Sequence, residues 1–160
     1  MSPTVEVVVA DARWRALAGV ARCCRGAARA ALAAAERDAT PAELAIVLTD
    51  DSEVRALNRR FRAVDKPTNV LAFPASDGPA PPAGAPRPLG DVTLAYETVA
   101  AEARDQGKPI ADHLSHLVVH GVLHLLGYDH AADADAEHME SLEVAVLAGL
   151  GIEDPYRARP

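Results

Sequence analysis

The chain is poor in cysteine and in aromatic residues. Its two cysteines, Cys23 and Cys24, are adjacent among 160 residues. Neighbouring cysteines rarely form an unstrained disulfide, so the sequence predicts reduced thiols and argues against a disulfide-stabilised secreted scaffold. Aromatic residues make up only 4% of the chain. We therefore expect a core of aliphatic side chains and alanine.

Basic residues are too few to balance the acids. Sixteen Lys and Arg against 23 Asp and Glu give a formal net charge of −7. Binding to a phosphate backbone needs a basic surface, so this charge argues against general nucleic-acid binding and DNA is not an expected partner. Contact with RNA would need a local basic cleft or a partner protein that supplies positive charge.

Long apolar runs are also absent from the sequence. No stretch could span a membrane, and the amino terminus lacks the basic and apolar regions of a secretory signal. Ala12 to Ala35 has no acidic residue and resembles a transit peptide in composition, but its arginines lie off an apolar stripe, as in a folded helix. These features predict one cytoplasmic domain over residues 1–160.

Apolar periodicity predicts the secondary structure. The expected strands are Thr4–Val9, Leu44–Leu48, Asn69–Phe73 and Gly90–Ala95, and the expected helices are 11–37, 53–61, 97–106, 110–126 and 133–150. This order predicts an α+β fold, a mixed four-stranded sheet with about five surrounding helices. Pro74 to Pro88 holds six prolines and two glycines, and we expect a loop of open role there.

The segment from His120 to His130 reads His-Gly-Val-Leu-His-Leu-Leu-Gly-Tyr-Asp-His. Residues four apart share one face of a helix, so His120 and His124 can point the same way. Gly127 can adopt the left-handed conformation that ends a helix, which would return His130 to the open side of the pair. Three imidazoles around one point, with a vacant fourth position, are typical of a catalytic zinc site.

The histidine spacing is that of the metzincin proteases, His-Glu-x-x-His-x-x-Gly-x-x-His. Gly121 stands where those enzymes carry the glutamate that activates water. The pattern therefore keeps the metal ligands and lacks the protease base. Imidazoles suit Zn²⁺ and also Ni²⁺ or other divalent ions, so the physiological metal stays open.

Other residues are candidates for completing the site. Arg62 and Lys66 belong to a basic cluster; a guanidinium matches phosphate oxygens, although such clusters are more often solvated helix ends. His116 lies one turn before the first metal histidine and could contact the substrate or a ligand, or be structural. Asp129 adjoins the third ligand position, where it could orient an imidazole or cap the turn.

Further signatures lie between Leu57 and Tyr156. They are Leu57-Asn58 with Phe61-Arg62, the run from Asp65 to Pro74, Leu89-Gly90-Asp91, His113 to His130, and Glu153-Asp154-Pro155-Tyr156. Together these segments resemble the YbeY-type rRNA-maturation endoribonucleases of bacteria. Ala72 departs from that pattern, which has serine there, and the proline-rich loop after Phe73 looks longer than usual.

The resemblance implies a zinc-dependent, single-strand-specific endoribonuclease that matures the 3′ end of 16S rRNA and acts in ribosome quality control. His120, His124 and His130 take the ligand positions, and Arg62 takes the place of the functionally important arginine. It also implies single-stranded rRNA as substrate. The acidic charge of the chain favours a ribosomal or ribosome-associated protein partner. A metalloprotease and a non-catalytic, metal-stapled ribosome-assembly factor stay open as alternatives, and the general base is unassigned.

Overall fold

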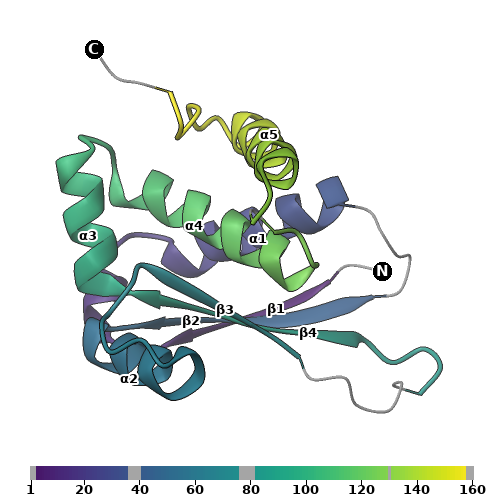
Figure 1. The fold of residues 1–160 in the computed structure, drawn as a ribbon, viewed down its shortest axis with the longest axis horizontal. Coiled ribbons are helices and arrows are strands. Elements are labelled where there is room, and N and C mark those ends of the chain that lie inside the picture. The colour runs from purple at the N-terminus through teal and green to yellow at the C-terminus, as the bar shows by residue number, and fades with distance from the viewer. Residues whose placement is uncertain (1–2, 36–40, 76–81, 130, 158–160) are drawn as a thin grey trace.

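The strands and helices follow one another in the predicted order (Figure 1). The computed structural model describes residues 3–35, 41–75, 82–129 and 131–157. Its strands are β1 (Thr4–Val9), β2 (Ala42–Thr49), β3 (Val70–Pro74) and β4 (Arg87–Ala95); its helices are α1 (Val20–Ala35), α2 (Asp51–Arg62), α3 (Tyr96–Asp105), α4 (Ile110–Leu125) and α5 (Asp133–Gly149). None of the helices within these ranges is long and apolar enough to cross a membrane.

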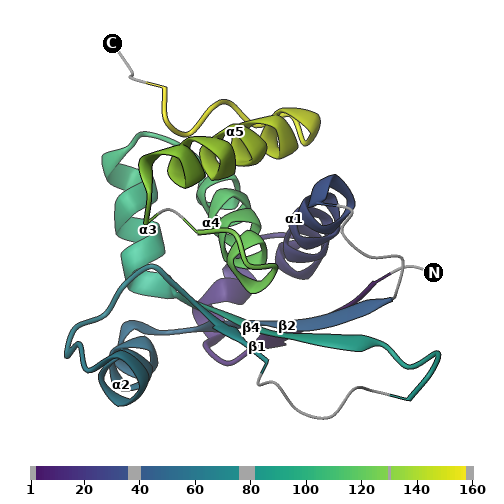
Figure 2. The same ribbon diagram turned by 45° about the vertical axis from the view of Figure 1, so that its right-hand side comes forward.

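The sheet has the strand order β1-β2-β4-β3. Strand β2 runs parallel to both β1 and β4, whereas β3 is antiparallel to β4 and forms one edge. The predicted mixed four-stranded sheet is confirmed. Helices α1, α4 and α5 lie on one side of the sheet and α2 lies on the other (Figures 1 and 2).

The two faces of the sheet carry separate hydrophobic clusters. The larger cluster lies between the sheet and helices α1 and α4, and includes Ile46 of β2 and Val122 of α4. The smaller cluster lies under α2 and joins Val54 to Leu71 of β3. Because side chains alternate along a strand, Ala72 belongs to the opposite cluster from Leu71. Strand β3 therefore contacts α4 through one face and α2 through the other.

The predicted start of the first helix is wrong. A short 3-10 helix spans Ala12–Ala16, Gly19 has a φ of 68°, and the α-helix begins only at Val20. Fully buried Trp14 donates its indole N–H to the carbonyl of Thr49 at 2.8 Å, which fixes the 3-10 turn against the end of β2. The apolar spacing continues across the break, so periodicity alone did not reveal it.

The remaining expectations for this region are partly tested. Cys24, whose thiol the sequence predicts to be reduced, is free and fully buried in the core, and burial raises the pKa of this thiol to about 12. The predicted helix end near Arg37 lies outside the described residues. Strand β4 begins at Arg87 rather than Gly90, so it takes up the end of the predicted loop; residues 76–81 of that loop also lie outside the described part.

Candidate active site

The histidine motif lies on α4 and on the turn that follows it. Gly127 has a φ of 96°, and its N–H donates to the carbonyl of His124 at 3.0 Å. The N–H of Tyr128 donates to the carbonyl of Leu123 at 3.0 Å. This paired arrangement is the Schellman motif, in which a left-handed residue ends the helix. The predicted turn at Gly127 is therefore confirmed.

His120 and His124 point together, as their spacing predicts. Their Nε2 atoms lie 3.1 Å apart and their ring centroids 4.6 Å apart. Two nitrogen ligands on a tetrahedral zinc, each 2.0–2.1 Å from the metal, would be separated by about 3.3 Å. Among the described residues, His, Cys, Asp and Glu form no group of three that could hold a metal. The third predicted ligand, His130, lies outside those residues.

Both rings line a cavity of about 530 Å³. The cavity lies where α4, the edge strand β3 and the end of α2 meet. Its described lining residues are Arg62, Thr68, Asn69, Val70, Ala72, Pro74, His120, Gly121, His124 and Asp129. The structure thus brings four of the predicted site residues together: Arg62, His120, His124 and Asp129.

Arg62 reaches the cavity from the far side of the sheet. It is the last residue of α2, and its guanidinium passes the ring of Phe73 with Cζ 6.0 Å from the ring centroid. One guanidinium nitrogen donates to the carbonyl of Ala72 at 3.3 Å. Because β3 is an edge strand, this side chain can pass around it. This contact uses the main-chain carbonyl of residue 72. Alanine in place of serine at this position therefore does not disturb it.

The loop after α2 is held by Asn58. Its buried side-chain amide donates to the carbonyl of Lys66 at 2.9 Å. The main-chain carbonyl of Asn58 accepts from the N–H of Val64 at 3.3 Å. Ala63 ends the helix in the left-handed conformation, with a φ of 58°. These contacts fix where α2 stops and therefore where its last residue lies. Lys66 itself is exposed in this loop and is not among the described residues that line the cavity.

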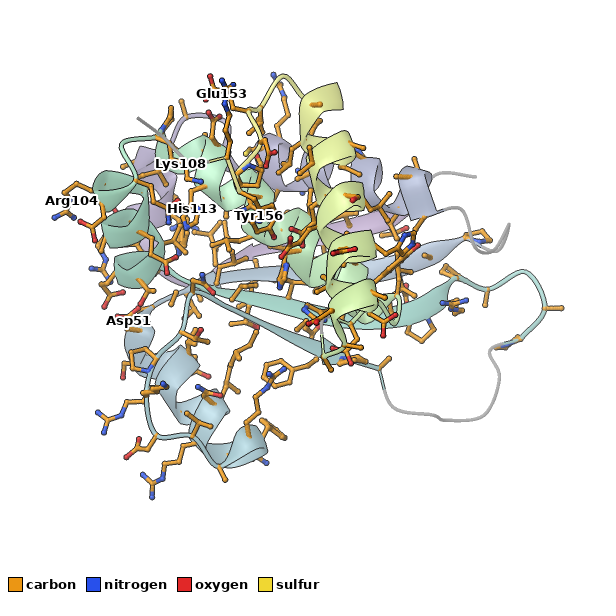
Figure 3. All side chains as sticks on the ribbon, turned by 45° about the horizontal axis from the view of Figure 1, so that its top comes forward. Asp51, Arg104, Lys108, His113, Glu153 and Tyr156 are labelled. Atoms are coloured by element: carbon orange, nitrogen blue, oxygen red, sulfur yellow. The ribbon has the colours of Figure 1, made fainter. Side chains whose placement is uncertain are left out.

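Sequence reasoning missed the central carboxylate of the site. Glu143 of α5 is fully buried and accepts a hydrogen bond from Nδ1 of His120. Its other oxygen accepts from the hydroxyl of Tyr156 and lies 3.3 Å from Nε2 of His116. Figure 3 shows Tyr156 in the carboxy-terminal segment alongside α5. An acid four residues after Met139, on the buried face of an apolar helix, was the available signal.

The environment of Glu143 favours its charged form. Burial by itself raises the pKa of this carboxyl, but hydrogen bonds from His116, His120 and Tyr156 outweigh burial and lower its pKa from 4.5 to about 2. Burial and the nearby carboxylate raise the pKa of Tyr156, so its hydroxyl stays protonated and donates. A buried, ionised acid therefore contacts the ring nitrogen of His120 that faces away from His124.

His116 takes an indirect position. Its Nε2 contacts Glu143, and its ring packs edge-on against Tyr156 with centroids 5.5 Å apart. It does not join the described residues lining the cavity, whereas Asp129 does. His138 is exposed on α5 and is not among the described residues that line the cavity.

Gly121 explains how closely α4 approaches the sheet. A Cβ atom placed on this residue would lie 2.6 Å from Cγ1 of Val92, a fully buried residue of β4. Valine has a stiff χ1, so it cannot easily yield. The position that carries the base in metzincins is therefore pressed against β4 here and has no room for a side chain.

A family model and several sequence relatives match most of the chain. The model of the Endoribonuclease YbeY family matches residues 17–151. Endoribonuclease YbeY of Rhodopseudomonas palustris (strain BisB5) is 54% identical over 159 residues, covering 96% of this chain and 82% of that protein. Endoribonuclease YbeY of Nitrobacter winogradskyi is 52% identical over 157 residues, covering 97% of this chain and 83% of that protein.

The fold is also found in a solved structure. The solution structure of a protein from Thermotoga maritima matches with a TM-score of 0.57 at 19% sequence identity, covering 97% of this chain and 100% of that one. At that identity the likeness concerns the fold alone. The sequence relatives, in contrast, share about half of their residues with this protein over nearly its whole length. The chain belongs to the endoribonuclease YbeY family.

Proposed function

We propose that this protein is a metal-dependent endoribonuclease that cleaves single-stranded RNA at the cavity between α4, β3 and the end of α2. Endoribonuclease activity follows from membership of the family. The metal, the role of each residue and the preference for single strands belong to the proposal. We further propose maturation of the 3′ end of 16S rRNA as the biological role, with a ribosome-associated protein as partner.

One observation carries the proposed metal centre. The Nε2 atoms of His120 and His124 converge at 3.1 Å on the wall of the cavity, while Nδ1 of His120 donates to buried Glu143. Histidines that bind a metal through one nitrogen commonly donate the other N–H to a carboxylate. The donor set fits Zn²⁺, and Ni²⁺ also suits imidazole ligands. His130 is the proposed third ligand.

Side chains around the proposed metal supply the other functions of the site. A divalent ion, when bound, supplies a Lewis acid that polarises the phosphodiester and activates water. Arg62 lines the same cavity, and its planar guanidinium can hold two non-bridging phosphate oxygens as negative charge builds up. Asp129 also lines this cavity, and its proposed role is to orient an imidazole ligand. His116 acts through Glu143, and no residue is assigned as general base.

The alternatives differ in features that can be measured. A metzincin-type protease needs a carboxylate at position 121, and the close contact with Val92 leaves no room for one. A non-catalytic assembly factor would use its metal only to hold the fold. In that case, removing the metal would lower the melting temperature strongly, as in small structural zinc domains.

The test joins elemental analysis of the purified protein to a cleavage assay with and without a chelator. We expect about one divalent ion per chain, loss of cleavage of single-stranded RNA on chelation, and helicity that is largely kept. His124→Ala should lose both metal and cleavage, and casein should stay intact throughout. Full cleavage by metal-free protein would refute the proposed centre.

A further inference from the structure

An exposed aromatic side chain adjoins the proposed active site. Phe61 has 58% of its surface exposed, more than any other exposed large hydrophobic residue in the described ranges. It lies in the last turn of α2, next to Arg62, whose guanidinium lines the cavity. A single exposed apolar side chain is ordinary on a protein surface; what distinguishes this ring is its position between a second aromatic ring and the arginines at the end of α2.

The ring of Phe61 packs against a second aromatic ring, and each of the two rings has a guanidinium group beside it. Its centroid lies 5.5 Å from that of Phe73 on β3, and the two rings are tilted by 60°. The guanidinium of Arg60 lies 5.0 Å from the Phe61 centroid, and that of Arg62 lies 6.0 Å from the Phe73 centroid. We name this group of four residues, Phe61, Phe73, Arg60 and Arg62, the aromatic step.

The charge around the aromatic step is locally basic although the chain is acidic. The last turn of α2 carries Arg59, Arg60 and Arg62. The acidic residues of this helix lie at its other end, in the first turn. Asp65, the acid in the following loop, is paired with Arg55 at 2.8 Å. This is the local basic surface that an RNA-binding protein of net charge −7 requires.

We propose that Phe61 stacks against a base of single-stranded RNA that lies next to the cleaved phosphodiester, and that Arg60 and Arg62 hold the adjoining phosphates. This proposal rests on the proposed function. Proteins bind single strands by combining a cationic path for the backbone with aromatic faces for the unstacked bases. A base in a duplex is already stacked between its neighbours, so the aromatic step also gives a physical reason for preferring single strands.

The test measures RNA binding separately from cleavage. Fluorescence anisotropy of a short labelled single-stranded RNA, checked to be intact afterwards, gives the dissociation constant of the full-length protein. Phe61→Leu should weaken binding about tenfold, and Phe61→Tyr should stay within about twofold of wild type. Leu150→Ala, which removes apolar surface at another exposed position, just after α5, should have no effect.

Two further measurements separate stacking from other roles of the ring. With an RNA that lacks the base at the stacked position, the difference between wild type and Phe61→Leu should vanish. In Phe61→Trp, single-stranded RNA should quench the new tryptophan, while Trp14, which is fully buried, stays unaffected. Equal weakening on intact and abasic RNA, or no quenching, would overturn the proposal.

The outcomes also separate this proposal from the one on which it rests. If the wild-type protein neither binds nor cleaves single-stranded RNA, the proposed function itself fails. If the wild type does both and Phe61→Leu binds as tightly, only the aromatic step is wrong.

Discussion

The carboxylate of Glu143 accepts a hydrogen bond from Nδ1 of His120, although 23 residues separate them in the sequence. The contact fixes the tautomer of the His120 ring. When Nδ1 carries the proton, Nε2 is unprotonated and carries a lone pair that can bind a metal. That lone pair lies on the side of His124 and the cavity. A buried acid on α5 therefore sets which nitrogen of a residue on α4 is available to a metal.

Replacing Glu143 should weaken metal binding. We expect Glu143→Gln to lower the affinity for Zn²⁺ by roughly 10–100-fold, because the neutral amide holds the imidazole less firmly and does not raise its basicity. Competition against a chromogenic chelator measures this affinity directly. Glu137→Gln, at an exposed position on the same helix, is the matched control and should bind as the wild type does. Equal affinity for both variants would refute this role of Glu143.

Arg62 should matter for the reaction and not for the metal. We expect Arg62→Ala to retain its metal content and to lose about 10²–10³-fold in cleavage rate, since removing one preorganised donor to a developing negative charge has an effect of that size. Arg62→Lys should recover only part of the rate, because an ammonium lacks the bidentate fork. Arg104→Ala, on the exposed surface of α3, serves as the control. Cleavage of single-stranded RNA at the wild-type rate by Arg62→Ala would remove this arginine from the mechanism.

Gly121→Ala should destabilise the fold, whereas the same exchange at Gly26 should not. The added methyl group would press on Val92, and overpacking of this kind costs about 1–3 kcal/mol. Gly26→Ala makes the same exchange within α1, where nothing lies within 4 Å of the new Cβ; it should stabilise the protein by up to about 1 kcal/mol through helix propensity. Urea unfolding of both variants tests the pair, and a Gly121→Ala variant as stable as wild type would show that the helix can move off the sheet.

The stability of the protein should decrease when His113 is forced to take up a proton. Burial lowers the pKa of His113 below 6.5, and its hydrogen bond to Glu102, at 2.9 Å, offsets this only in part; Lys108 and His116 also lower it. Its Nδ1 is buried with no hydrogen-bond partner in the described part of the chain, so protonation would bury an unsatisfied donor. Figure 3 marks the position of His113 on α4.

The sign of this pH effect follows from the direction of the shift. The unfolded chain binds a proton at a higher pH than the folded one, so the contribution of His113 is fully present above pH 6.5 and is lost as the pH falls through the folded-state pKa. Urea titrations at about pH 7.5 and about pH 5 should show a smaller loss of unfolding free energy for His113→Gln than for the wild type. An identical loss in both proteins would mean that other groups carry the effect.

Local patterns account for the parts of the site that the sequence predicted. The convergence of His120 and His124 depends on a four-residue spacing, and the turn at Gly127 depends on one left-handed residue, so both can be derived from neighbouring positions. The contact of Glu143 depends on how α5 packs across α4, which no local pattern specifies. The place of Arg62 needed the family resemblance, because its route around β3 depends on which strand lies at the edge of the sheet.

The fold shows the same division between local and long-range information. Alternation and periodicity sufficed to predict the mixed sheet and its helices. The break before α1 escaped prediction because Trp14 and Cys24 are both buried and keep a helical spacing across it. What divides that segment is the hydrogen bond from Trp14 to Thr49, a partner 35 positions further along the chain.

The hydroxyl of Tyr156 ties the site to the segment that follows α5. This phenol donates to Glu143, whose other oxygen accepts from His120. A chain cut short just after α5 would keep every described strand and helix in its sequence and would lose one donor to the acid behind His120.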